Sequence, residues 1–142
     1  MNKRDQTETF THVRDWVFDL DNTLYPAACN LFAEIDQRMT SFVVELLNVE
    51  RDEARRVQKD LYVAHGTTLA GLMREHDVDP HNFMDYVHEI NLEPLSPAPD
   101  LKRAIAALPG RKFVHTNGSC QHAANFLGKL GLEGIFDYVF DV

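Results

Sequence analysis

Two carboxylates, Asp19 and Asp21, lie at the end of a short apolar, β-prone run that begins at Trp16 and extends to Asp21. A central strand that ends here would bring both side chains to the carboxyl end of a sheet, where α/β proteins hold their ligands and where alternate residues share a direction. Neighbouring carboxylates repel each other unless one is protonated or a hard cation lies between them, and Mg²⁺ favours oxygen ligands. The pair predicts a metal-dependent phosphate site in which one carboxylate attacks phosphorus and the other moves protons.

The Asp-x-Asp spacing has two other interpretations. Asp and Asn favour the first residues of loops, so Asp19, Asp21 and Asn22 are also typical of a turn without chemistry. Some glycosyltransferases carry a metal-binding Asp-x-Asp as well. The tripeptide alone does not separate these alternatives.

The elements around the pair follow from apolar spacing and helix-end signals. After the first strand, helices are predicted over 31–47 and 51–65, from Thr67 or Thr68 through Met73, and from Asp79-Pro80 to about residue 90. A stiff proline-spaced segment over 95–99 precedes a helix over 101–108, a strand over 112–116, a helix over 119–130 and a strand over 138–142.

This order of elements predicts an α/β fold with a Rossmann-like parallel sheet, of which three strands are present, and an inserted helical cap. We expect residues 1–25 and 96–142 to form the core and residues 26–95 to form the cap, after a polar lead-in over residues 1–15.

Composition narrows the classes of function. The 142 residues are 44% hydrophobic and 25% charged, which is typical of a soluble globular domain. The net charge of −8 argues against broad nucleic-acid binding, and no apolar run approaches the roughly 18 residues that cross a membrane. Cys29 and Cys120 have no ligand spacing, and no apolar leader follows Met1, so we expect a reducing cytoplasm.

The longer string from Val17 to Pro26, VFDLDNTLYP, closely resembles motif I of the haloacid dehalogenase-like phosphohydrolases. The resemblance implies that Asp19 is the nucleophile and binds Mg²⁺. It further implies that Asp21 is the general acid and base and also contributes to the metal site, and that Thr23 supports the loop. Retention of Asp21 argues against dehalogenase chemistry, which lacks the second carboxylate.

The string from Phe113 to Gly118, FVHTNG, is similar to the second motif of that superfamily, a hydrophobic strand that ends in Thr or Ser. By this resemblance, Thr116 and the backbone amide of Asn117 bind the phosphoryl group. A hydroxyl and backbone N–H groups at a strand end and helix start form a suitable anion cradle. Without the first motif, this string is better explained by a tight turn at Asn117-Gly118 and a helix cap at Thr116.

Further segments, at 22–26, 66–72, 86–88 and 116–119, look like the pyrimidine 5'-nucleotidase branch, and the likeness covers nearly all of residues 13–142. It implies a Mg²⁺-dependent phosphatase that hydrolyses a small phosphorylated metabolite, expected to be a pyrimidine nucleoside 5'-monophosphate, through an aspartyl phosphate. A sugar-phosphate phosphatase or phosphomutase on the same scaffold is the enzymatic alternative. The alternative without catalysis is a catalytically inactive, truncated domain with a binding role.

The family pattern continues after the third strand with a Lys and an acidic pair, which would lie beyond Val142. Lys129 precedes that strand and is better explained as a charge at a helix end. We therefore expect an apparent truncation that leaves an open sheet edge, through which the chain could form a homo-oligomer. The seven histidines show no metal-ligand spacing, and surface or packing roles are expected for them.

Overall fold

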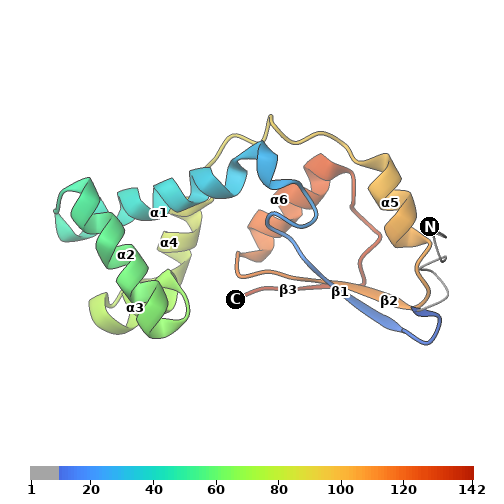
Figure 1. Cartoon of the computed structure of the whole chain (residues 1–142), viewed down its shortest axis with the longest axis horizontal. Coiled ribbons are helices and arrows are strands. Elements are labelled where there is room, and N and C mark those ends of the chain that lie inside the picture. Colours follow the sequence, from blue (N-terminus) through green and yellow to red (C-terminus); the bar gives the residue numbers. More distant parts are fainter. Residues whose placement is uncertain (1–9) are drawn as a thin grey trace, which may run out of the picture. The chain divides into compact units, whose positions relative to one another are not determined.

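The computed structural model describes residues 10–142, and most of the expected polar lead-in, residues 1–9, lies outside the described residues. Figure 1 shows the elements in chain order, which are β1 (Asp15–Asp19), the 3-10 helix η2 (Ala27–Cys29), α1 (Leu31–Leu47), α2 (Arg51–His65), α3 (Thr68–His76), α4 (Pro80–Val87), α5 (Pro99–Ala106), β2 (Arg111–His115), α6 (Cys120–Leu130) and β3 (Tyr138–Phe140). The contacts divide the chain into an α/β unit, residues 1–29 and 92–142, and a helical unit, residues 30–91.

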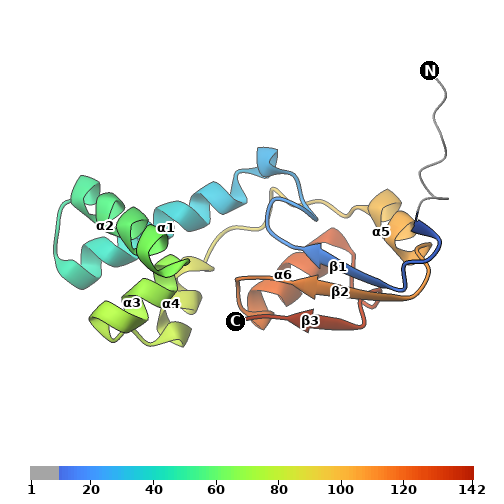
Figure 2. The same ribbon diagram turned by 60° about the horizontal axis from the view of Figure 1, so that its bottom comes forward.

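The α/β unit contains a three-stranded parallel sheet in the order β1-β2-β3 (Figure 2). Val17 of β1 pairs with Phe113 of β2, which pairs in turn with Tyr138 of β3. Parallel strands of this kind need helical or otherwise long connections, and the chain supplies the helical unit and α6. The predicted α/β class with a parallel sheet is thereby confirmed.

The first strand ends earlier than predicted. It ends at Asp19 instead of running to Asp21, because the carbonyl of Leu20 accepts hydrogen bonds from the amides of Thr23 and Leu24 and so begins a turn. Among the described residues it pairs with β2 alone, so its other side is the open sheet edge that we expected from the family resemblance.

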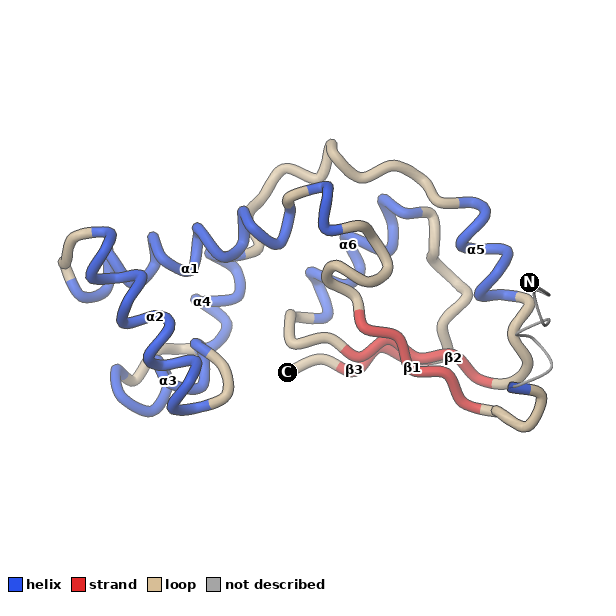
Figure 3. The backbone as a smooth tube through the Cα atoms, viewed as in Figure 1, coloured by secondary structure: helices blue, strands red, loops and turns tan. Residues whose placement is uncertain are grey.

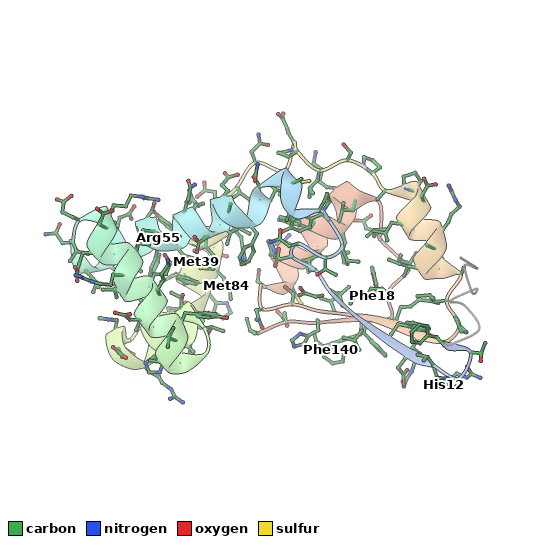
Figure 4. All side chains as sticks on the ribbon, viewed as in Figure 1. His12, Phe18, Met39, Arg55, Met84 and Phe140 are labelled. Carbon is green, nitrogen blue, oxygen red and sulfur yellow. The ribbon has the colours of Figure 1, made fainter. Side chains whose placement is uncertain are left out.

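Helices cover one face of this sheet among residues 10–142. Figure 4 shows Phe18 on the side of α5 and α6 and Phe140 on the opposite side, as the alternation of strand residues requires. Phe18 makes an edge-to-face contact with Phe136, at 5.9 Å between ring centroids. Val17, Tyr138 and Phe140 on the opposite face are all substantially exposed. The core of the unit therefore lies between the sheet and its helices.

The helical unit forms its own apolar core from α1 to α4. Its buried members share positions on the inward stripes of these helices and are Ile35, Val43, Ala54, Leu61, Leu72, Phe83 and Val87. No helix within residues 10–142 combines the length and the apolar character that a membrane span requires.

Local end signals position the helices, and most were legible in the sequence. Thr67 and Asp79 cap α3 and α4 by accepting from backbone amides, with Pro80 in the first turn of α4. Gly66 and Gly131 follow α2 and α6 with positive φ, where glycine costs least. The segment 95–99 was expected to be extended throughout, but its last residue, Pro99, already belongs to the first turn of α5. Figure 3 shows the loop that leads into this helix.

Candidate functional site

The candidate residues of the α/β unit lie at or just after the carboxyl ends of its strands, that is, at the carboxyl end of the sheet. Asp19 is the last residue of β1 and pairs with His115, the last residue of β2. Its exposed carboxylate accepts a hydrogen bond from the Thr23 hydroxyl, 3.1 Å from Thr23 Oγ1 to Asp19 Oδ2. Thr23 thus lies where it orients Asp19.

Asp21 lies in the turn after β1 and has different partners. Its Oδ1 accepts a hydrogen bond from the Tyr25 hydroxyl over 2.7 Å and lies 2.9 Å from Nε2 of His122 on α6. Its side chain is 17% exposed, whereas that of His122 is 1% exposed. The strand alternation that predicted a shared direction with Asp19 therefore ends before Asp21, and buried side chains orient this carboxylate instead.

An aromatic cluster supports the two partners of Asp21. The Phe126 ring lies 5.0 Å from the Tyr25 ring and 4.3 Å from the His122 ring, centroid to centroid. All three rings are almost completely buried. Burial, and next the nearby Asp21 carboxylate, raise the pKa of the Tyr25 hydroxyl far above its ordinary value. Tyr25 therefore remains protonated and donates to Asp21 across the physiological pH range.

The second predicted group follows β2. Thr116 is fully buried, its amide donates to the carbonyl of Phe140, and its hydroxyl accepts from the amide of Gly118 over 3.0 Å. A hydroxyl has one proton to donate beside its two lone pairs, so this contact leaves Thr116 with its donor capacity. Asn117 is exposed, directly after Thr116 and before the first turn of α6. Thr116 and Asn117 therefore lie at the same carboxyl end of the sheet as Asp19.

The amino end of α6 also lies at this carboxyl end of the sheet, because the helix begins shortly after β2 ends. Ser119 caps the helix by accepting from the amide of His122, 3.1 Å from N to Oγ, and Asp141 accepts from the amide of Cys120 over 2.9 Å. A carboxylate at the start of a helix is electrostatically favourable. The hydrogen bond from the Cys120 thiol to Asp141, and next burial, raise the pKa of that thiol.

The donor set for a metal ion in this region consists of carboxylates. No cluster of three or more His, Cys, Asp or Glu side chains suited to a metal occurs in the part of the chain that the structure describes. Mg²⁺ in phosphoryl-transfer sites is commonly held by one or two carboxylates together with water and substrate phosphate. An acidic pair such as Asp19 and Asp21 suits Mg²⁺ better than a metal that needs a full set of protein ligands, and their role as metal ligands stays a prediction.

Sequence reasoning missed two residues at this site. His122 was expected on the surface or in ordinary packing, whereas its ring contacts Asp21 from a buried position. Tyr25 was read only as part of a motif. The four-residue step from Asp21 to Tyr25 was a usable signal for a local contact, but 101 residues separate Asp21 from His122 and no local pattern connects them.

The chain was compared with protein-family models, curated proteins and solved structures. No protein-family model matches the chain. It is similar to phosphate metabolism protein 8 of Saccharomyces cerevisiae, with 26% identity over 131 residues that cover 84% of this chain and 40% of the yeast protein. The solved structure of the putative HAD-hydrolase YfnB from Bacillus subtilis bound to magnesium matches with a TM-score of 0.49 and 17% identity, over 90% of this chain and 64% of that chain. The chain thus spans less than two thirds of the length of each of these two proteins.

Proposed function

We propose that this chain carries the catalytic carboxylates of a haloacid dehalogenase-like phosphatase that hydrolyses phosphomonoesters through an aspartyl phosphate. The observation that carries the proposal is the separate orientation of two carboxylates at one strand end. Thr23 holds Asp19, while Tyr25 and His122 hold Asp21. Distinct surroundings for two neighbouring acids are what a division between nucleophile and proton carrier requires.

In the first half of the reaction, a carboxylate oxygen of Asp19 attacks phosphorus and the bond from phosphorus to the ester oxygen breaks. Asp21 gives its proton to the leaving alcohol oxygen. Asp19 is exposed and at the end of a strand, so a substrate phosphate can reach it from outside the unit. The products of this half are the alcohol and a phosphorylated Asp19.

In the second half, water attacks the same phosphorus and the bond from phosphorus to Asp19 breaks. Asp21 accepts the proton of the water, which restores both carboxyl groups to their starting states and releases inorganic phosphate. The Thr116 hydroxyl and the Asn117 amide are the proposed donors to the phosphoryl oxygens. Mg²⁺, held by the Asp19 carboxylate and, as the motif resemblance implies, by the backbone carbonyl of Asp21, would supply positive charge that offsets the negative charge on those oxygens.

The proposed substrates are pyrimidine nucleoside 5'-monophosphates. Support for a phosphate compound comes from the carboxylate arrangement and from the name of the yeast relative, phosphate metabolism protein 8. The nucleotide assignment rests on the motif resemblance at Asn22–Pro26 and in the segments 66–72 and 116–119. The substrate class therefore rests on the motif resemblance alone.

Release of inorganic phosphate from a panel of monophosphates, with Mg²⁺ and with a chelator, tests the proposal. The panel contains pyrimidine and purine nucleoside 5'-monophosphates and hexose phosphates. Mg²⁺-dependent release that is fastest from pyrimidine nucleotides is expected. Faster release from hexose phosphates would reject the nucleotidase assignment, and no release from any compound would reject the enzyme in favour of a binding domain.

A further inference from the structure

We infer that Tyr25 and His122 are positioning residues that hold the Asp21 carboxylate in its working orientation. This inference rests on the proposed function of Asp21 as the proton carrier. It assigns the buried histidine of α6 a role in the reaction, although that side chain is neither a nucleophile nor a ligand of the phosphate.

Two contacts converge on a single oxygen of Asp21. The Tyr25 hydroxyl oxygen lies 2.7 Å from Asp21 Oδ1, and Nε2 of His122 lies 2.9 Å from the same atom. Both distances are those of good hydrogen bonds to a carboxylate. Because the partners come from two segments far apart in sequence, rotation of the carboxylate away from this position would break both bonds at once.

The two partners are themselves fixed. Tyr25 is 1% exposed and His122 is 2% exposed, and both rings pack against Phe126. The backbone of His122 is held in the first turn of α6, where its amide donates to the Ser119 side chain. Rigid side chains of this kind can hold a reactive group where mobile surface side chains cannot.

The burial of these polar groups supports a role beyond packing. A phenol hydroxyl and an imidazole in the interior need hydrogen-bond partners, and apolar rings would fill the same space without that requirement. Here both groups meet a carboxylate at the strand end that carries Asp19. Because misplacement of a reacting group by about 1 Å costs on the order of 10²-fold in rate, fixing Asp21 is a direct contribution to turnover.

Three variants test the inference in the full chain. Tyr25→Phe removes only the hydroxyl and keeps the ring against Phe126. His122→Ala removes the imidazole, and His122→Gln restores an N–H of similar reach. Loss of outer partners of a reacting site typically costs about 10- to 100-fold in activity. We expect kcat to fall by that factor in Tyr25→Phe and His122→Ala with KM unchanged, and to recover for the most part in His122→Gln.

Matched controls come from the helical unit. Tyr86→Phe removes a hydroxyl that also donates to a carboxylate, Oε1 of Glu45, over 2.7 Å. His65→Gln replaces a histidine that pairs with Glu75 over 2.6 Å. Both controls are expected to keep kcat. A purely structural role of Tyr25 and His122 would lower the free energy of unfolding without lowering the kcat of the folded protein.

A second readout is independent of turnover. The ¹³C NMR signal of the Asp21 side-chain carboxyl, assigned with Asp21→Asn, should shift in Tyr25→Phe and His122→Ala and stay in place in Tyr86→Phe. If the unaltered chain turns over and both variants keep its kcat, the inference is overturned while the proposed function stands. If the unaltered chain releases no phosphate, the proposed function fails; a shifted carboxyl signal then supports the positioning contacts, and an unmoved one overturns them.

Discussion

The α/β unit and the helical unit each contain a tyrosine hydroxyl that donates to a carboxylate over 2.7 Å, in opposite surroundings. In the helical unit the acceptor is Glu45, which is exposed. In the α/β unit Tyr25 is buried and its acceptor, Asp21, also meets His122. A hydrogen bond on the surface competes with water and fixes little, whereas the same bond in the interior fixes its carboxylate.

The two units also differ in what their buried polar groups contact. In the helical unit the Thr40 hydroxyl donates to Gln58 over 2.6 Å, and Gln58 donates to Asp36 over 2.7 Å, so these groups join α1 to α2. In the α/β unit Thr116 and His122 lie beside the strand ends that carry the candidate carboxylates. The helical unit thus uses interior polarity to join helices, and the α/β unit uses it next to its candidate site.

The largest effect on kcat is expected when the carboxylate itself is replaced, at the candidate site and at an exposed position of the helical unit. Asp21→Asn should lower kcat by about 10²–10⁴-fold because proton transfer is lost. Asp60→Asn, the same change at an exposed position of α2, should leave kcat as it is. Phosphate release under saturating substrate measures both. Equal activity in Asp21→Asn and the unaltered chain would remove the proton-transfer role of Asp21.

A core substitution tests whether the units are separate in stability. Phe83 is 1% exposed in the core of the helical unit. Phe83→Ala should cost about 3–5 kcal/mol there, because it removes buried contacts and leaves a cavity. Amide hydrogen exchange should accelerate over residues 30–91 and stay slow in β2. Equal acceleration in β2 would show one cooperative unit instead of two.

The exposed strand β1 allows a smaller test, of association. We propose that copies of the chain associate through this sheet edge, where Val17 is 65% exposed. Val17→Lys should shift sedimentation toward the monomer, because a lysine on an edge strand opposes pairing with another chain. Val63→Lys, at an 82% exposed position of α2, is the matched control. A monomeric unaltered chain at all concentrations would contradict the proposal.

The smallest expected effect concerns the start of α6. The hydrogen bond from the Cys120 thiol to Asp141 stabilises the protonated thiol and raises its pKa. Asp141→Asn should therefore lower this pKa, increase the thiolate fraction near pH 8 and accelerate alkylation of Cys120 by iodoacetamide several-fold. Peptide mass spectrometry against time follows the reaction at Cys120 separately from that at Cys29. Slower alkylation in Asp141→Asn would contradict the assigned cause.

Local patterns predicted much of the fold because they are read within a few residues. The apolar stripe over 31–47 and the glycine after residue 65 gave helices whose bounds agree with α1 and α2. A cap at Asp79 was predicted for the same reason, and of the two predicted candidates Thr67 and Thr68 it is Thr67 that caps α3. The end of β1 was misplaced because the turn depends on two hydrogen bonds to the Leu20 carbonyl, and no spacing in the sequence specifies these.

The candidate site was only partly accessible from sequence. Asp19, Asp21, Thr23, Thr116 and Asn117 were chosen from motifs, and their roles stay predictions. The contact between Asp21 and His122 depends on how α6 packs beside the turn after β1, which is a tertiary result. A lone histidine on an amphipathic helix gives no such information, which is why a surface or packing role was expected for His122.

The covalent mechanism is tested most directly by trapping the phosphorylated nucleophile. Substrate carrying labelled phosphate is mixed with the chain and Mg²⁺, the reaction is quenched in acid within one turnover, and peptides are analysed by mass spectrometry. A covalent mechanism through Asp19 predicts a hydroxylamine-sensitive phosphate on the peptide that contains Asp19, and its absence in Asp19→Asn. Turnover without any labelled Asp19 peptide, or full turnover by Asp19→Asn, would contradict it.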